Sequence, residues 1–248
     1  MILHNMNCKD FLQNDNTQYD LCITSPPYNM RVKINYGKYT TRTDDNHISK
    51  KYKTFKDCYR QQDFYDFHYN ILNLLLQRCD LIFYNISIVT GSKRPFFKLI
   101  GEFADYLKDI IIWYRSHAQP TICNGVLNRK HEQILIFDRN NAISRQFKQC
   151  NFKRGTMDDV WRFKRQRSRD KNHKATFPVQ LSNKIIENFA KPGMKIIDPF
   201  MGTGTVGISA LKYDCSFTGI ELDKETFKHA EKRLSSEEIQ KPLFWSIK

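Results

Sequence analysis

Short apolar runs alternate with longer stretches of helical periodicity along most of this 248-residue chain. A strand that is followed by a helix and then by another strand requires a crossover connection, so the alternation predicts a mostly parallel sheet. The predicted strands are 20–24, 80–89, 109–114, 133–137, 194–198 and 217–221, and the predicted helices are 61–78, 93–107, 177–190, 203–211 and 224–234. We therefore expect a doubly wound α/β fold with helices on both faces of the sheet.

The composition limits the class of protein. Hydrophobic residues make up 40% of the chain, which is enough for one sizeable core. No apolar run approaches the roughly 18–20 residues that a membrane-spanning helix needs, and the first residues lack the pattern of a secretory signal. The seven cysteines are scattered without a Cys-x-x-Cys pair, which argues against a disulfide framework or a four-cysteine zinc site and indicates reduced thiols in a cytoplasm.

The formal net charge of +14 is concentrated in two segments. Residues 139–174 carry twelve Lys and Arg against three acids, and residues 31–60 carry nine against three, so the rest of the chain is close to neutral. Both segments also contain aromatic residues, which can stack on exposed bases while the cations neutralise phosphates. We interpret both as loops that bind nucleic acid, the first of them mobile without its ligand. Solvated basic loops without a partner are the alternative.

A glycine-containing turn lies between a predicted strand and a predicted helix near the C-terminal end. It reads Asp198-Pro199-Phe200-Met201-Gly202-Thr203-Gly204-Thr205, and the next strand ends at Glu221, 19 residues after Gly202. Glycines let a ligand approach the backbone, and an acid in that place can accept both hydroxyl hydrogens of a ribose. The turn lacks the third glycine of the dinucleotide fingerprint and the Lys of a P-loop, so it indicates a nucleoside cofactor site. A purely structural turn is the alternative.

A second distinctive turn follows the predicted strand 20–24. In Ser25-Pro26-Pro27-Tyr28 two prolines fix the backbone, so the carbonyl groups of Ser25 and Pro26 can point at a ligand with little freedom to turn away. Tyr28 offers a flat face for stacking on a planar base that carries an exocyclic amine. Ligands bind at the carboxyl ends of strands in such a sheet, where both turns are expected. A proline-rich turn that only caps a strand is the alternative.

Together these motifs resemble those of the S-adenosylmethionine-dependent DNA amino-methyltransferases. The segment 25–28 matches the family's catalytic pattern (Asp/Asn/Ser)-Pro-Pro-(Tyr/Phe), and 198–204 matches its Phe-x-Gly-x-Gly cofactor loop. The catalytic motif precedes the cofactor loop, which is similar to the β-class arrangement. The resemblance spans about residues 5–235, and 131–137 is similar to the family's strand before the target-recognition region. It implies a Rossmann-like methyltransferase fold with a short basic target-recognition insert.

The expected site residues fall into three groups. The catalytic motif is Ser25, Pro26, Pro27 and Tyr28. The cofactor-binding residues are Asn7, Asp198, Phe200, Gly202, Gly204, Thr205 and Glu221, together with His173, Lys174 and Thr176, which resemble the segment that contacts the methionine part of the cofactor. The DNA-binding residues, from the densest basic run, are Arg162, Lys164, Arg165, Arg167 and Arg169.

The expected organisation is one core in two halves. Residues 1–138 form the catalytic half, residues 139–172 the target-recognition segment, and residues 173–248 the cofactor-binding half. The resemblance implies S-adenosylmethionine as the cofactor and double-stranded DNA as the partner. A cognate restriction endonuclease and a homodimer are family expectations, and no membrane partner is expected.

The expected reaction is methyl transfer to an exocyclic amine of a base flipped out of DNA. Acceptors on the two amine hydrogens would localise the nitrogen lone pair, and Ser25 Oγ and the Pro26 carbonyl are the candidates. This chemistry requires no metal and no covalent intermediate. Within the family, serine at the first motif position is more frequent for N4 of cytosine, which is the expected target. The alternatives are N6 of adenine, an RNA substrate, or a nucleic-acid-binding module without catalysis.

Overall fold

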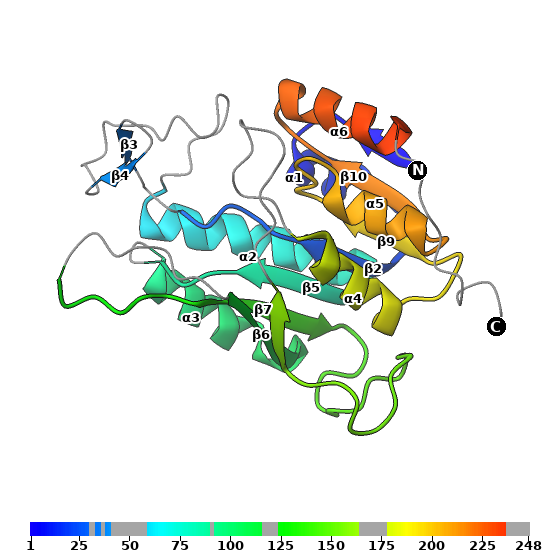
Figure 1. Cartoon of the computed structure of the whole chain (residues 1–248), viewed down its shortest axis with the longest axis horizontal. Coiled ribbons are helices and arrows are strands. Elements are labelled where there is room, and N and C mark those ends of the chain that lie inside the picture. The colour runs from blue at the N-terminus through cyan, green and yellow to red at the C-terminus, as the bar shows by residue number, and fades with distance from the viewer. Residues whose placement is uncertain are drawn as a thin grey trace.

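One mixed sheet forms the centre of the computed structural model (Figure 1). The structure describes residues 1–29, 33–35, 38–40, 59–89, 92–115, 124–163 and 178–236. Within these residues eight strands run in the order β1-β10-β9-β2-β5-β7-β6-β8. Their bounds are β1 Ile2–His4, β2 Tyr19–Thr24, β5 Cys79–Ile86, β6 Leu107–Arg115, β7 His131–Asp138, β8 Val160–Phe163, β9 Lys195–Asp198 and β10 Ser216–Ile220. Five of the seven strand pairs in this sheet are parallel, and the two that involve β7 are antiparallel.

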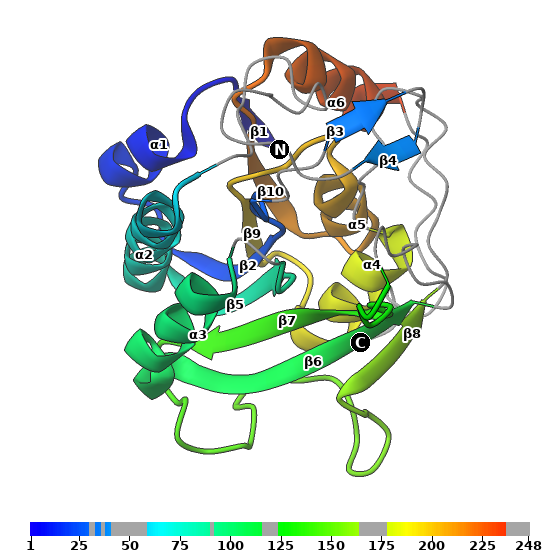
Figure 2. The same cartoon turned by 90° about the vertical axis from the view of Figure 1, so that its left-hand side faces the viewer.

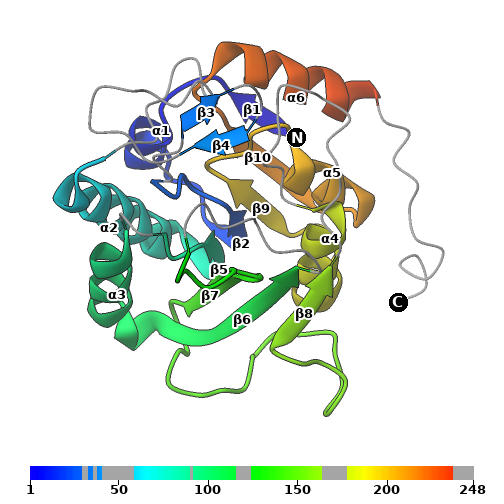
Figure 3. The ribbon, with the colours of Figure 1, turned by 60° about the vertical axis from the view of Figure 1, so that its left-hand side comes forward.

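Helices cover both faces of the sheet, with α1, α2 and α3 on one side and α4, α5 and α6 on the other (Figures 2 and 3). Their bounds are α1 Cys8–Asn14, α2 Gln61–Arg78, α3 Lys93–Glu102, α4 Val179–Phe189, α5 Thr205–Lys212 and α6 Lys224–Ser236. Alternate strand residues serve the two layers, because Cys22 packs with the first set of helices while Leu21 and Ile23 pack with the second. The predicted doubly wound, mostly parallel α/β fold is confirmed.

Several predicted boundaries differ from those observed. Strand β5 ends at Ile86, three residues before the predicted end. Helix α3 ends at Glu102, because a short 3₁₀ turn at Ala104–Tyr106 leads directly into β6. Strand β1 and helix α1 were not predicted at all. They have three and seven residues, which is too short for hydrophobic periodicity to reveal.

The prediction that both basic segments are loops is wrong in part. The first contains the two strands of a hairpin, β3 Lys33–Asn35 and β4 Lys38–Thr40, and the second contains β8, which pairs in parallel with β6. A strand of three or four residues inside a charged run gives almost no periodic signal. In β8 the signal is Trp161, which is only 1% exposed although it lies in a charged part of the chain. Most of 31–60 lies outside the described residues, so its mobility stays a prediction.

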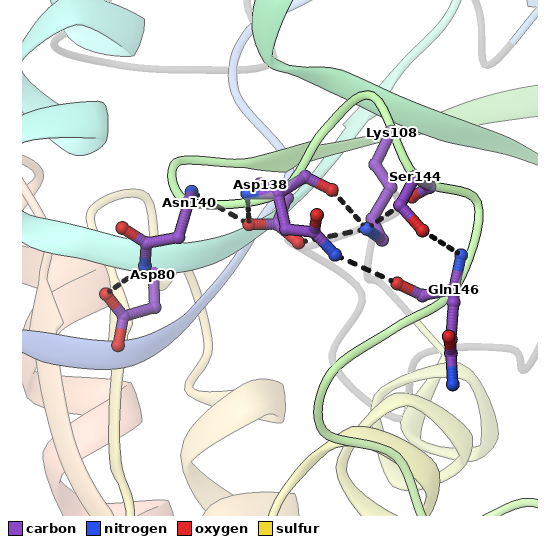
Figure 4. Close-up of polar contacts among 7 residues, drawn as sticks. Asp80, Lys108, Asp138, Asn140, Ser144 and Gln146 are labelled. Atoms are coloured by element: carbon purple, nitrogen blue, oxygen red, sulfur yellow. Dashed lines mark hydrogen bonds and ion pairs between the residues drawn. The ribbon is translucent and has the colours of Figure 1, made fainter.

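Lys108, in β6, fixes the turn that follows β7 (Figure 4). Its completely buried ammonium group lies 3.2 Å from a carboxylate oxygen of Asp138 and donates to the backbone carbonyl groups of Asn141 and Ser144. The other Asp138 oxygen accepts the N–H groups of Asn140 and Asn141, at 2.9 and 2.8 Å. The start of the basic segment 139–174 is therefore anchored to the sheet.

The five cysteines in the described part of the chain are not joined by disulfides. Four of them are buried, and burial raises the pKa of the Cys8 and Cys215 thiols to about 12. These two thiols therefore behave as small apolar side chains rather than as nucleophiles. No helix in the described ranges is both long and apolar enough to cross a membrane.

Candidate active site

The two turns singled out in the sequence lie side by side in the sheet. Strand β2, which precedes the Ser-Pro-Pro-Tyr turn, pairs in parallel with β9, which precedes the glycine loop. At the carboxyl ends of these strands Thr24 donates its hydroxyl hydrogen to Asp198, with 2.7 Å between the oxygens. Two segments 174 residues apart in the chain are thereby fixed next to each other.

This position is also where the sheet reverses its winding. From β2 the chain continues to α2 on one face, whereas from β9 it continues to α5 on the other (Figure 3). The helices that follow β2 and β9 therefore lie on opposite faces of the sheet, which is the arrangement that forms ligand-binding crevices in open α/β sheets.

Asn29 closes the Ser-Pro-Pro-Tyr turn. It has a φ of 59°, in the left-handed region that asparagine tolerates better than most residues. Its side chain is buried and forms two hydrogen bonds with the backbone of Tyr59: Nδ2 donates to the carbonyl at 3.0 Å, and Oδ1 accepts the N–H at 2.7 Å. These two hydrogen bonds therefore join Asn29 and Tyr59, the residues on either side of the segment 30–58.

A polar network surrounds the Tyr28 hydroxyl. That hydroxyl donates to Glu132 Oε2 at 2.9 Å and lies 2.9 Å from Ser25 Oγ. The Asn85 amide nitrogen contacts the same hydroxyl and lies 3.3 Å from Ser25 Oγ and 3.1 Å from Glu132 Oε2. The second Glu132 oxygen forms an ion pair with Arg115 at 3.0 Å. Two of the predicted catalytic residues, Ser25 and Tyr28, thus join a network with three residues from β5, β7 and β6.

The electrostatics of this network keep the Tyr28 hydroxyl protonated. Burial, together with the negative charge of Glu132, raises the pKa of Tyr28 well above its usual range. The hydroxyl group therefore keeps its hydrogen at neutral pH and donates it in a hydrogen bond to the Glu132 carboxylate. The Tyr28 ring is therefore held through its hydroxyl group, in the turn that follows β2.

The glycine loop after β9 adopts a conformation that needs glycine. Gly204, directly before α5, has a φ of 78°, and a Cβ atom there would lie 2.9 Å from the side chain of Leu234. Arg233 in α6 reinforces the loop by donating to the Thr203 carbonyl at 3.1 Å and to the Thr205 hydroxyl at 3.3 Å. Helix α6 therefore packs against this loop and holds it.

Glu221 lies across from this loop, directly after β10. Its two carboxylate oxygens accept the N–H groups of Gly202 and Asp223, at 3.0 and 2.8 Å. Burial raises the pKa of Glu221 above its usual range, although these N–H groups oppose the shift. Each oxygen accepts one hydrogen and can accept another. A ribose diol beside the loop fits this carboxylate, so the residues present suit a nucleoside cofactor.

Asp198 is the buried carboxyl at the join between the two motifs. It accepts the Thr24 hydroxyl and the N–H of Phe200, at 2.7 and 3.1 Å. Burial raises its pKa to about 7. The side chain therefore fixes the entrance of the loop, and its charge depends on pH near neutrality.

The remaining predicted cofactor residues are near this loop or outside the described part. Asn7 caps α1 by accepting the N–H of Lys9 at 2.8 Å, two residues after Asn5, which donates to the Glu221 carbonyl. The half-buried ring of Phe200 packs against Phe67, with ring centres 5.8 Å apart. His173, Lys174 and Thr176 lie outside the described residues, as do Lys164, Arg165, Arg167 and Arg169. Arg162 is exposed on β8, with its guanidinium 5.6 Å from the centre of the Tyr114 ring.

Sequence reasoning missed Asn85, Glu132 and Arg115. Each is a buried polar residue at, or next to, one end of its strand. That pattern was visible in the sequence, where Glu132 was noted only as part of the apolar segment 131–137. That these three side chains lie close together follows only from the strand order β2-β5-β7-β6, in which β5, β7 and β6 follow one another beside β2.

The fold and the site define a class. The sheet is doubly wound, and its glycine loop faces an acid at the adjacent strand end. The rigid Ser-Pro-Pro-Tyr turn lies beside that loop. This combination is typical of methyltransferases that use a nucleoside cofactor and act on an amine.

Comparisons with known proteins assign the family. The chain belongs to the N6/N4 DNA methylase family, whose model matches residues 19–232. It is therefore a DNA amino-methyltransferase that depends on S-adenosylmethionine and acts on N6 of adenine or N4 of cytosine.

Individual relatives agree with this assignment. The chain is 27% identical over 238 residues to the type II methyltransferase M.HpaI of Haemophilus parainfluenzae, covering 88% of this chain and 68% of that protein. It is 24% identical to M.BglII of Bacillus subtilis, covering 92% and 67%.

Solved structures confirm the fold. The cytosine-N4-specific PvuII DNA methyltransferase superposes with a TM-score of 0.71 at 14% identity, covering 93% of this chain and 85% of that one. The complex of M1.HpyAVI with SAM gives a TM-score of 0.61 at 20% identity, covering 94% and 98%.

Proposed function

We propose that this protein transfers a methyl group to N4 of a cytosine flipped out of double-stranded DNA, within a specific recognition sequence. The observation that carries the proposal is the fixed position of the Ser25 turn beside the cofactor loop, through the Thr24–Asp198 hydrogen bond of 2.7 Å. This hydrogen bond supports a site in which an amine acceptor lies next to the methyl donor. N6 of adenine is the second candidate, because both amines need the same two acceptors.

Two observations favour cytosine. Ser25 occupies the first motif position, where the family resemblance makes serine more frequent for N4 of cytosine than for N6 of adenine. The structural neighbour PvuII methyltransferase is specific for cytosine N4. Its fold match covers 93% of this chain.

The residues at the strand ends divide the work of the reaction. Bound S-adenosylmethionine supplies an electrophilic methyl group on a sulfonium. Glu221 would accept the ribose hydroxyls, while Asp198, Phe200, Gly202, Gly204 and Thr205 shape the adjoining loop. Asn7, which caps α1, would also contact the cofactor. Ser25 Oγ and the Pro26 carbonyl would hold the two amine hydrogens, an interaction that strengthens as the nitrogen becomes tetrahedral.

The basic segments would hold the DNA. Arg162 on β8 and Lys164, Arg165, Arg167 and Arg169 after it would neutralise phosphates on both sides of the flipped base. In this arrangement residues 1–138 form the catalytic half, 139–172 the recognition segment and 173–248 the cofactor half. A DNA substrate would place the protein in the cytoplasm. A restriction endonuclease with the same recognition sequence would be its counterpart, and the protein would assemble as a homodimer.

Methylation of unmodified genomic DNA with labelled S-adenosylmethionine tests the proposal. Nucleosides from the product are separated by mass spectrometry, and the expected product is N4-methylcytosine. Detection of N6-methyladenine instead would show that the target is N6 of adenine, the second candidate. Label transfer to RNA but not DNA, or no transfer to either while DNA is bound, would contradict the proposal. A matched Ser25→Ala variant should lose most of the transfer while retaining binding of S-adenosylmethionine.

A further inference from the structure

A row of buried polar side chains crosses four neighbouring strands beside the proposed methyl-transfer site. Ser25 follows β2, Asn85 belongs to β5, Glu132 to β7 and Arg115 to β6, and these strands are adjacent in that order. Burial is unusual for such residues, since Asn85, Glu132 and Arg115 are 2, 8 and 7% exposed. Charged groups at this depth are retained at a cost in stability, so the row calls for an explanation beyond packing.

The hydrogen-bond directions in this row are fixed by the available hydrogens. Glu132 is a carboxylate and only accepts, and Tyr28 has a single hydroxyl hydrogen, which it donates to Glu132 Oε2 with 2.9 Å between the oxygens. The Tyr28 oxygen must therefore accept the hydrogen of Ser25, whose Oγ lies 2.9 Å away. Ser25 Oγ is then left as an acceptor towards the turn, with one lone pair used by Asn85 at 3.3 Å and another open.

Arg115 determines which Glu132 oxygen faces Tyr28. Its Nη1 lies 3.0 Å from Oε1, so the ion pair holds that oxygen and leaves Oε2 to the hydroxyl. The side chains of both partners are about one tenth exposed, at 9 and 11%. The carboxylate is therefore fixed in direction and still reaches water at one side.

We propose that Glu132 is a positioning residue that orients Ser25 through Tyr28, and the final acceptor of the proton released by the target amine. This inference rests on the proposed function. As the amine nitrogen bonds to the methyl carbon, the carbon–sulfur bond breaks and its electron pair goes to sulfur. The nitrogen proton passes to Ser25 Oγ, the Ser25 proton to the Tyr28 oxygen, and the Tyr28 proton to Glu132 Oε2. Water later removes the proton from Glu132, which restores the starting state.

The variant Glu132→Gln tests the direction of this relay. Arg115 would attract the amide oxygen, which turns the amide N–H towards the Tyr28 oxygen and reverses both hydroxyls. Ser25 would then present a hydrogen instead of a lone pair to the amine. We expect the single-turnover methylation rate to fall about 100-fold, while calorimetry gives unchanged dissociation constants for S-adenosylmethionine and DNA. Wild-type rate in this variant would overturn the inference.

Tyr28→Phe removes the middle of the relay and leaves both the aromatic ring and the Glu132–Arg115 ion pair in place. It carries the test even if Glu132→Gln does not fold. We expect a similar loss of rate, while calorimetry gives unchanged dissociation constants for S-adenosylmethionine and DNA. Because the two residues act through one chain, the double variant should be no slower than the slower single variant. Losses that multiply in the double variant, or a wild-type rate for Tyr28→Phe, would overturn the inference.

Asp138→Asn is the matched control. Asp138 lies on the same strand as Glu132, about 20 Å away along it, and is also a buried carboxylate paired with a cation. Its substitution should lower stability and leave the single-turnover rate at saturating DNA unchanged. A wild-type protein that methylates no DNA overturns the proposed function itself. A wild-type protein that methylates at the same rate as Glu132→Gln overturns only the relay.

Discussion

Asp198 shows how a residue at the join between two motifs links stability to pH. Its carboxyl group is buried, its ordinary pKa is 3.8, and burial raises that pKa to about 7. Between these values the folded protein keeps a proton that the unfolded chain has released. The free energy of unfolding therefore falls as pH rises from about 4 to about 7, and this contribution is fully lost above that range.

The Asp198→Asn variant should remove this dependence. An asparagine carbonyl can still accept the hydrogens of Thr24 and Phe200, but it carries no charge to desolvate. We expect the cofactor-free variant to exceed the wild type in unfolding free energy at pH 8 by roughly 2–4 kcal/mol. Urea unfolding of both proteins at pH 5 and pH 8 measures the difference. Curves that stay parallel across this range would contradict the assignment of the shift to Asp198.

Asn29 combines a left-handed backbone with two buried hydrogen bonds to Tyr59, and two substitutions separate these effects. Asn29→Gly keeps the backbone free to adopt its φ of 59° but loses both bonds, which should cost about 2 kcal/mol. Asn29→Ala should cost roughly 1 kcal/mol more, because alanine disfavours that conformation. Chemical denaturation provides both values. Equal stability of the two variants would show that the backbone conformation contributes nothing.

At the residue scale, sequence reasoning located consecutive motifs but not residues that meet through the fold. The segments 25–28 and 198–205 were identified because each motif is continuous in the chain. Asn85, Glu132 and Arg115 were not, because no local pattern says that residues of three different strands join one polar network. Their convergence depends on strand order, which short-range periodicity does not encode.

Lys108 gives the element scale its clearest energetic test. The variant Lys108→Met leaves the Asp138 carboxylate buried without its cation and should lower the unfolding free energy by about 3–5 kcal/mol. Adding Asp138→Asn should restore part of the loss, since the amide oxygen still accepts the N–H groups of Asn140 and Asn141. Urea unfolding measures stability, and hydrogen exchange at those two amides reports the turn. A double variant less stable than Lys108→Met would contradict this account.

Helices and strands were predicted correctly where the segment was long enough for the spacing of apolar residues to repeat. Helix α2, at 61–78, was predicted with its observed bounds because six apolar residues recur on one face over five turns. Helix α5 was predicted two residues too early, because the glycine loop occupies the first part of the apolar stretch. The short strand β8 was hidden because it has only four residues and lies at the start of a charged run.

At the scale of the whole molecule, the uneven charge predicts how DNA affinity responds to salt. Replacing Arg165, Arg167 and Arg169 by glutamine should reduce the slope of log affinity against log salt by about 2.7 if each contacts a phosphate. Fluorescence anisotropy with labelled duplex DNA, measured over several salt concentrations, gives the slope. The exposed α6 residues Lys224, Lys228 and Lys232 provide a control with the same change in net charge. An unchanged slope in the first variant would exclude that segment from the interface.

The central position of β2 has a consequence for synthesis of the chain. Strand β2 emerges early and finds β5 soon afterwards, but its other neighbour, β9, appears only about 170 residues after β2. Throughout that interval the growing polypeptide carries an unpaired, strongly apolar strand edge, which is the kind of surface that pairs with foreign strands. Products of premature termination before residue 195 should therefore be insoluble, and the nascent protein is a natural client for a chaperone.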